Sequence, residues 1–248
     1  EPLENQIGYL KISSFSKLTE KQLKKYLKQA KLEGVTGFIL DLRGNPGGLL
    51  NQSVKVASHF LFKGQMVVYT QGRSKDDYRE YRSLYKENLH KMPVVVLINQ
   101  YSASASEIVA GALRESDNAL LIGENSYGKG SVQTIFRISD GSGVRLTTSK
   151  YFTPAGTDIT KNGIVPEIKI INDLIKEKES TVTKKSSNSD TLLSLKASSL
   201  KKFFEKQGLN KKHDATVELA RRILKNSHTA SKKRSMEKAR EIAASINY

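Results

Sequence analysis

Three short apolar runs constrain the fold of this 248-residue chain more than any other feature. They are Gly37–Leu42, Pro93–Ile98 and Ala119–Gly123. Each run is almost continuously apolar, a pattern typical of a parallel strand that is covered on both faces. Segments with helical periodicity alternate with them, at Thr19–Lys31, Leu49–Phe62 and Ser102–Leu113. The chain therefore predicts an α/β fold in which helices flank a mostly parallel, layered sheet.

Further strands are expected around this set. Ile7–Ile12 and Met66–Thr70 have strand patterns. Val132–Ile138 and Val144–Phe152 are separated by a Ser-Asp-Gly-Ser-Gly turn, which predicts a β-hairpin near the end of the sheet region. An exit strand is expected at Glu167–Ile171.

The polar segment Gln71–Lys91 carries three tyrosines, Tyr78, Tyr81 and Tyr85, at helical spacing. We interpret it as a surface helix whose tyrosines pack inward. The alternative is a long loop that flanks a substrate cleft, since long loops inside compact domains are often functional.

Composition excludes several classes of protein. The chain has no cysteine, so disulfides, thiol nucleophiles and cysteine metal sites are excluded, and four scattered histidines disfavour a structural zinc site. No run approaches the roughly 18 apolar residues of a membrane span. The first residue is Glu, which leads us to expect a mature or excised fragment. We predict no cofactor and no bound metal.

The C-terminal third differs from the rest of the chain. Asn172–Asp190 is polar and predicts a linker. Residues 191–248 are basic and are expected to form a small α-helical appendage docked on the core. Its helices are marked by Leu192, Leu195, Leu200, Phe203 and Phe204, then Val217, Ala220, Ile223 and Leu224, then Met236, Ala239, Ile242, Ala243 and Ile246.

The net charge of +16 suits an anionic partner such as nucleic acid, wall polymer or lipid headgroups. Much of the excess lies in residues 171–248, which hold twice as many Lys and Arg as Asp and Glu. A generally lysine-rich composition explains the charge equally well. No nucleic-acid-binding motif is present, so that function is disfavoured.

Ser104 is the candidate nucleophile. It lies in the expected first turn of the helix Ser102–Leu113, where unpaired N–H groups favour developing negative charge. The four histidines lie near no second motif, so the candidate base is Lys129, in a tight turn between Gly128 and Gly130. Close helix packing would also explain the Ala and Ser residues, and a solvated loop would explain the Gly-Lys-Gly turn.

A glycine-rich loop, Arg43–Gly48, follows the first apolar run. It has neither the G-x-G-x-x-G spacing nor a Walker sequence, so nucleotide binding is disfavoured. Its glycines would let the main chain approach a ligand closely, and a Gly47 or Gly48 N–H could stabilise an oxyanion together with the N–H of Ala105. A flexible turn is the alternative.

Together these segments resemble the C-terminal processing peptidases, or tail-specific proteases, which are serine peptidases with a Ser/Lys dyad. The nucleophile block of that family resembles Ser102–Ile108, and its base block resembles Tyr127–Gly130. The Asp41–Gly48 loop resembles its DLR-x-N-x-GG block, and its closing blocks resemble Tyr151–Gly156 and Gly163–Pro166. The resemblance covers about residues 6 to 171.

The resemblance implies a role for each site residue. Ser104 would attack the scissile carbonyl, Lys129 would take its proton and Gln133 would support the lysine. Backbone N–H groups of Gly48 and Ala105 would hold the oxyanion, and Asp41 and Arg43 would brace the turn. We expect Ile122, Val132 and Ile135 to wall in the Lys129 amine, because burial favours the neutral form of lysine.

The same resemblance implies a serine endopeptidase that cleaves in the C-terminal region of protein substrates, in the periplasm or cell envelope. Residues 1–171 would be its catalytic core. The family commonly carries a PDZ domain before the Gly8–Ile12 strand, and only seven residues precede Gly8 here. An upstream PDZ domain or adaptor, a membrane anchor and a homo-oligomer formed through the C-terminal helices are candidate partners and attachments. The rival functions are an inactive peptide-binding relative and a basic envelope-binding or nucleic-acid-binding protein.

Overall fold

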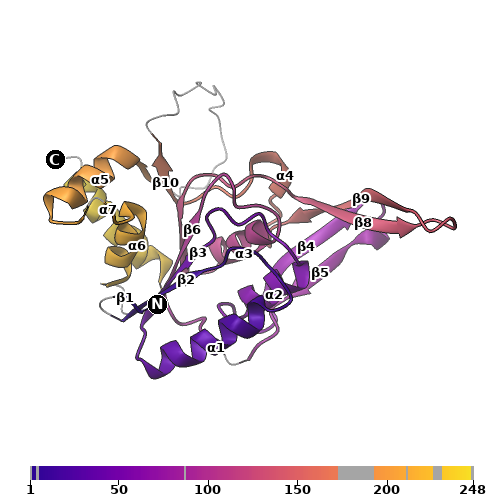
Figure 1. Ribbon diagram of the computed structural model, residues 1–248, viewed down its shortest axis with the longest axis horizontal. Coiled ribbons are helices and arrows are strands. Elements are labelled where there is room, and N and C mark those ends of the chain that lie inside the picture. Colours follow the sequence, from indigo (N-terminus) through magenta and orange to yellow (C-terminus); the bar gives the residue numbers. More distant parts are fainter. Residues whose placement is uncertain are drawn as a thin grey trace.

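Two sheets organise the computed structural model, which describes residues 2–3, 6–86, 88–172, 193–210, 212–225 and 231–246 (Figure 1). The larger sheet has the order β1-β2-β3-β6-β7-β10-β11 in the described residues, and its neighbours are parallel except for β1 and β2. Its strands are β1 (Pro2–Leu3), β2 (Ile7–Lys11), β3 (Gly37–Asp41), β6 (Val94–Ile98), β7 (Ala119–Gly123), β10 (Ile168–Ile171) and β11 (Leu193–Lys196). The predicted mostly parallel α/β sheet is therefore confirmed.

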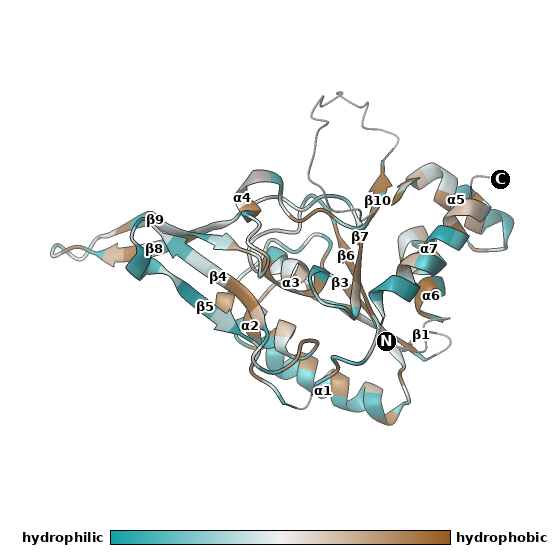
Figure 2. Cartoon of the chain, turned by 180° about the vertical axis from the view of Figure 1, so that it is seen from behind, coloured by the Kyte–Doolittle hydropathy of each residue, from teal (hydrophilic) through white to brown (hydrophobic). Residues whose placement is uncertain are grey.

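Helices cover both faces of this sheet, which is why its central strands are apolar at every position except Asp41, the last residue of β3. Side chains alternate along each strand: Leu40 and Val96 join one buried cluster, whereas Ile39, Val95 and Leu97 join the other. Figure 2 shows the hydrophobic residues of these strands between the helical layers. The first layer is α1 (Thr19–Leu32), α2 (Leu50–Ser58) and α3 (Ala105–Arg114), and the second is α5 (Ala197–Lys206), α6 (Ala215–Lys225) and α7 (Lys232–Ile246).

The C-terminal segment adds one strand to the main sheet and covers one of its faces. Leu193–Lys196 form β11, which pairs in parallel with β10, so Leu195 lies on a strand and not on the expected helix. Phe204, Leu219 and Ile223 are fully buried in the cluster that covers the second face. The segment is thus one of the two helical layers, where we expected a small appendage. Except for Asn172, the predicted linker at 172–190 lies outside the described residues.

The smaller sheet is antiparallel, in the order β5-β4-β9-β8. Its strands are β4 (Met66–Gly72), β5 (Arg79–Arg82), β8 (Ser131–Arg137) and β9 (Gly143–Phe152). The predicted hairpin is confirmed as β8 and β9, which project away from the helical layers (Figure 1). A short helix, α4 (Ile159–Asn162), follows this hairpin.

The prediction of a surface helix within Gln71–Lys91 is wrong. This segment contains one 3-10 turn, η1 (Lys75–Asp77), and the strand β5, which pairs antiparallel with β4. Its tyrosines share no helical face: Tyr81 packs on the core, while Tyr85 donates a hydrogen bond to Glu20. Tyrosines at this spacing are compatible with a helix and also with a turn followed by a strand. Here pairing with the edge of β4 favours the strand.

None of the helices in the described part of the chain has both the length and the apolar character needed to cross a bilayer.

Candidate active site

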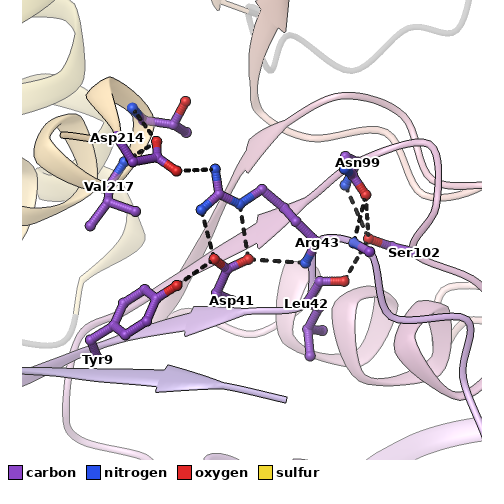
Figure 3. Close-up of polar contacts among 10 residues, drawn as sticks. Tyr9, Asp41, Leu42, Arg43, Asn99, Ser102, Asp214 and Val217 are labelled. Atoms are coloured by element: carbon purple, nitrogen blue, oxygen red, sulfur yellow. Dashed lines mark hydrogen bonds and ion pairs between the residues drawn. The ribbon is translucent and has the colours of Figure 1, made fainter. Parts of the chain in front are cut away.

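Three loops meet at the carboxyl ends of β3, β6 and β7, the edge at which open α/β sheets commonly bind ligands. Hydrogen bonds tie them together. Ser102 Oγ donates to the Leu42 carbonyl at 2.9 Å, and Asn99 Oδ1 accepts from the Gly44 N–H at 3.0 Å (Figure 3). The Tyr127 N–H donates to the Ser102 carbonyl at 3.0 Å. Parallel topology thus brings the Arg43–Gly48 loop, the Ser104 turn and the Lys129 loop to one place.

Ser104 stands immediately before α3, with φ +54° and ψ −112°. A positive φ is strained for a residue that has a Cβ, and such strain is held only where the surroundings fix the backbone. Here the Ser104 N–H donates to Glu107 Oε2 at 2.8 Å, while the Ser104 carbonyl accepts from the N–H groups of Glu107 and Ile108. Ser104 therefore occupies a sharp turn at a helix N-terminus, close to where the sequence placed it.

Glu107 joins the Ser104 turn to the Lys129 loop. Its side chain is fully buried and accepts four hydrogen bonds. Oε2 receives the N–H groups of Ser104 and Lys129 at 2.8 and 2.9 Å, and Oε1 receives Ser126 Oγ and the Gly128 N–H, both at 2.6 Å. Because two of these N–H groups share one oxygen atom, the backbones of Ser104 and Lys129 are neighbours. Sequence reasoning assigned Glu107 no role, although Ser-x-x-Glu before an apolar helix is a capping pattern that could have revealed it.

The side chains of Lys129 and Gln133 are both exposed. Gln133 lies on β8, as expected, beside a bulge at Val132 and Gln133. No hydrogen bond joins the side chains of Ser104, Lys129 and Gln133, all of which lie in the described part of the chain. The prediction that Ile122, Val132 and Ile135 bury the Lys129 amine is wrong, because Lys129 is exposed. Ile135 is itself 68% exposed, and Ile122 belongs to the buried cluster on the side of the sheet covered by α5–α7.

The glycine loop packs directly against the Ser104 turn. Gly47 has φ +104°, and a Cβ there would lie 2.6 Å from the Ala103 carbonyl oxygen and 2.8 Å from Ser104 Cβ. Only glycine permits both this conformation and this approach. Within the described residues, the N–H groups of Gly48 and Ala105 have no intramolecular acceptor. The hydrogen-bonding capacity of these two N–H groups is therefore unused within the described residues.

Asn45 fixes the shape of this loop and was not identified from the sequence. It is fully buried, donates from Nδ2 to the Ile12 carbonyl at 2.8 Å and accepts the Gly47 N–H at 2.8 Å. Its own carbonyl accepts the Ala103 N–H at 3.0 Å and Ser106 Oγ at 2.9 Å. The Asn45 side chain thus ties the glycine loop to the residue after β2, and the Asn45 carbonyl ties it to the start of α3.

Asp41 and Arg43 brace the base of the loop, as the resemblance implies. Arg43 donates to both oxygens of Asp41, at 2.9 and 2.6 Å, and Tyr9 OH donates to Asp41 Oδ2 at 2.7 Å. Burial by itself would raise the pKa of Asp41, but the hydrogen bonds from Arg43 and Tyr9 and the charge of Arg43 outweigh it. The pKa of Asp41 therefore lies below its ordinary value.

In the part of the chain that the structure describes, no group of three His, Asp or Glu side chains is placed to hold a metal ion.

Comparison with known proteins identifies the class to which this fold and site belong. Residues 6–170 match peptidase family S41, and the chain belongs to that family. The resemblance to C-terminal processing peptidases is therefore confirmed.

Relatives by sequence include the carboxy-terminal-processing protease of Bartonella bacilliformis, 45% identical over 170 residues, which make up 67% of this chain and 39% of that protein. Carboxy-terminal processing protease CtpA of Bacillus subtilis is 44% identical over 169 residues, or 68% of this chain and 36% of that protein. Among solved structures, the photosystem II D1 C-terminal processing protease superposes with a TM-score of 0.61 at 37% identity, covering 66% of this chain and 42% of that one. The chain thus spans well under half the length of these relatives.

Proposed function

We propose that this protein is a serine endopeptidase that cleaves peptide bonds in the C-terminal region of protein substrates. The observation that carries the proposal is the arrangement around Glu107, which holds the backbones of Ser104 and Lys129 beside two unpaired N–H groups, those of Gly48 and Ala105. The names of the relatives supply the substrate class, since they are carboxy-terminal processing proteases.

In the proposed mechanism, Ser104 Oγ attacks the carbonyl carbon of the scissile bond while the neutral Lys129 amine takes its proton. The oxyanion of the tetrahedral intermediate accepts hydrogen bonds from the N–H groups of Gly48 and Ala105. Its collapse expels the amine product, which takes the proton from Lys129. Water then attacks the acyl-enzyme, with Lys129 again as base.

The exposed lysine requires one further step in this mechanism. A bound peptide that covers the Lys129 amine would remove water from it, and desolvation favours the neutral form of a lysine. Gln133 would then orient the amine toward Ser104. The Ser/Lys dyad would accordingly be completed when substrate binds.

The relatives also guide the proposed setting. They are bacterial and chloroplast processing proteases, so we place this protein outside the cytoplasm, in a bacterial periplasm or envelope or in an organelle derived from bacteria. Its partners are protein substrates. An upstream PDZ domain or adaptor, and assembly through α5–α7, belong to the same proposal.

The test incubates the protein and its Ser104→Ala variant with an unfolded protein, followed by mass spectrometry of the fragments. We expect the parent protein to cut the substrate into fragments and Ser104→Ala to produce none, because this variant lacks the nucleophile. Ser194→Ala, which removes an exposed serine on β11, serves as the matched control and should cleave normally. Equal cleavage by the parent and Ser104→Ala would overturn the mechanism. Peptide binding without cleavage by the parent would instead indicate the inactive relative.

Lys129→Arg tests the base separately. Arginine keeps the positive charge but does not deprotonate in the working pH range, so this variant should be as inactive as Lys129→Ala. The measurement is kcat/KM from pH 6 to pH 10 for both variants and the parent. Substantial activity in Lys129→Arg would show that the lysine only anchors a negative group or braces the turn.

A further inference from the structure

The first turn of α6 reaches the loop that carries Gly48. Asp214 caps this helix, since its Oδ1 accepts the N–H groups of Thr216 and Val217 at 2.9 and 3.2 Å. Its other oxygen, Oδ2, lies 2.7 Å from Arg43 Nη1 (Figure 3). One carboxylate therefore joins a helix of the second layer to the glycine-rich loop.

Arg43 is held by two carboxylates at once. Its Nε and Nη2 pair with Asp41, and its Nη1 pairs with Asp214. A guanidinium is planar and presents its donors in a fixed fork, so contacts on both sides set its orientation. Asp41 alone would leave the Nη1 side of the fork open to water.

The position of Arg43 bears on the proposed oxyanion site. The Arg43 N–H donates to Asp41 Oδ1, and the next residue, Gly44, is held by Asn99. Arg43 thus begins the loop whose far end is Gly48, and Asn45 and Gly47 lie between them against the Ser104 turn. Arg43 and Gly48 therefore belong to one hydrogen-bonded loop, and the Arg43 side chain is where Asp214 contacts it.

We propose that Asp214 is a positioning residue for the peptidase site, acting through Arg43 on the loop that presents the Gly48 N–H. This inference rests on the proposed function. Asp214 lies outside residues 6–170, the part of the chain that matches the family. The C-terminal helical layer would then serve the site directly as well as cover the sheet.

The decisive variant is Asp214→Asn, because asparagine caps helices about as well as aspartate but carries no charge. The side chains of Arg43 and Asp214 are 22% and 44% exposed. For a partly exposed ion pair we expect kcat to fall roughly three- to fivefold with KM unchanged. The loss should shrink in high salt, where the parent pair is itself screened. Asp214→Glu, which keeps the charge, should recover part of kcat.

Glu218→Gln provides the matched control. Glu218 lies one turn further along α6 and pairs with Arg221 and Arg222 on the same helix. Its loss should lower the melting temperature but leave kcat unchanged, provided that all assays are run well below the melting transition. A fall in kcat in Asp214→Asn alone supports the proposal, whereas equal falls in both variants would assign the effect to α6 stability and overturn it.

Hydrogen exchange separates this proposal from the proposed function. In the full chain, the hydrogen-bonded backbone amides of Gly44, Asn45 and Gly47 should exchange faster in Asp214→Asn than in the parent or in Glu218→Gln. This measurement needs no catalytic activity, so it tests positioning even if the parent cleaves nothing, an outcome that would refute only the peptidase. Unchanged exchange at Gly44, Asn45 and Gly47 in Asp214→Asn would overturn the role of Asp214.

Discussion

At the scale of single residues, the site depends on buried polar groups whose partners come from distant parts of the chain. Glu107 accepts from four donors and Asn45 bonds three backbone segments, and neither contains a reacting atom. A buried polar group left without its partner costs more than the hydrogen bond contributed, so these residues tolerate little change.

Glu107→Gln is the sharpest test of that dependence. The amide nitrogen that replaces one oxygen cannot accept, so either the pair Ser104 and Lys129 or the pair Ser126 and Gly128 loses its acceptor. We expect the free energy of unfolding to fall by about 1–3 kcal/mol for each unpaired donor, and kcat/KM to fall by more than tenfold. Urea unfolding and peptide kinetics measure the two effects. Glu124→Gln, a partly exposed carboxylate in the same loop, is the control, and an equal effect there would contradict the role of Glu107.

We expect His59 to make stability depend on pH. It is 7% exposed and lies 3.3 Å from Glu20 Oε1, with Tyr85 and Lys24 also facing it. Burial lowers the pKa of His59 more than Glu20 raises it, so the folded state binds fewer protons than the unfolded chain. Stability should therefore be complete above the unfolded pKa of about 6.5 and fall as pH drops through it toward the lower folded value.

The measurement for His59 is urea unfolding between pH 8 and pH 5. His59→Gln should give a flatter dependence of the free energy of unfolding on pH, while His213→Gln, at an exposed position, should match the parent. The same slope in all three proteins would mean that the titration of other groups controls this range.

At the scale of elements, the sequence predicted the strands that are buried on both faces to within one or two residues. Apart from Asp41, every residue of these strands is apolar on either face, so their pattern can be interpreted without knowing which elements cover them. The strands are Gly37–Asp41, Val94–Ile98 and Ala119–Gly123. β5 escaped prediction because its pairing with β4 is visible only in three dimensions. The packing of Gly47 on the Ser104 turn is likewise a contact between two elements, and residue types alone could not supply its geometry.

Gly47→Ala tests that packing. The added Cβ would meet the Ala103 carbonyl oxygen at 2.6 Å in a backbone conformation with φ +104°, so the loop or the Ser104 turn must move. We expect kcat/KM to fall by at least about tenfold, since a small displacement of a catalytic group is costly. Gly44→Ala is the matched control, because Gly44 also has a positive φ, +74°, but no atom lies within 4 Å of the added Cβ. Similar losses in both variants would point to backbone strain, not to contact with the Ser104 turn.

At the scale of the whole molecule, the two helical layers differ in their relation to the part of the chain that matches the family. The layer formed by α1–α3 belongs to the part that matches peptidase family S41, and it positions Ser104 at the start of α3. The second layer, α5–α7, lies beyond that match. The sequence predicted its helices from their apolar positions but not its place on the sheet, because an apolar stripe does not say which surface covers it.

Removing residues 191–248 is the test at this scale. The deletion takes away β11 and the helices that bury Ile39, Val95, Leu97 and Leu120, all of which are fully enclosed in the intact chain. Burial of each such side chain stabilises the folded state by about 1.5–3 kcal/mol, whereas the free energy of unfolding of a typical domain is only about 5–15 kcal/mol. We therefore expect the truncated chain to lose its cooperative melting transition or to self-associate, although it retains Ser104 and Lys129. Circular dichroism melting and light scattering after size exclusion measure both outcomes, with a chain that lacks only residues 247–248 as control. If the melting temperature, the oligomeric state and the activity all stay unchanged, the C-terminal layer is an independent module and the second face of the sheet must be stable without it.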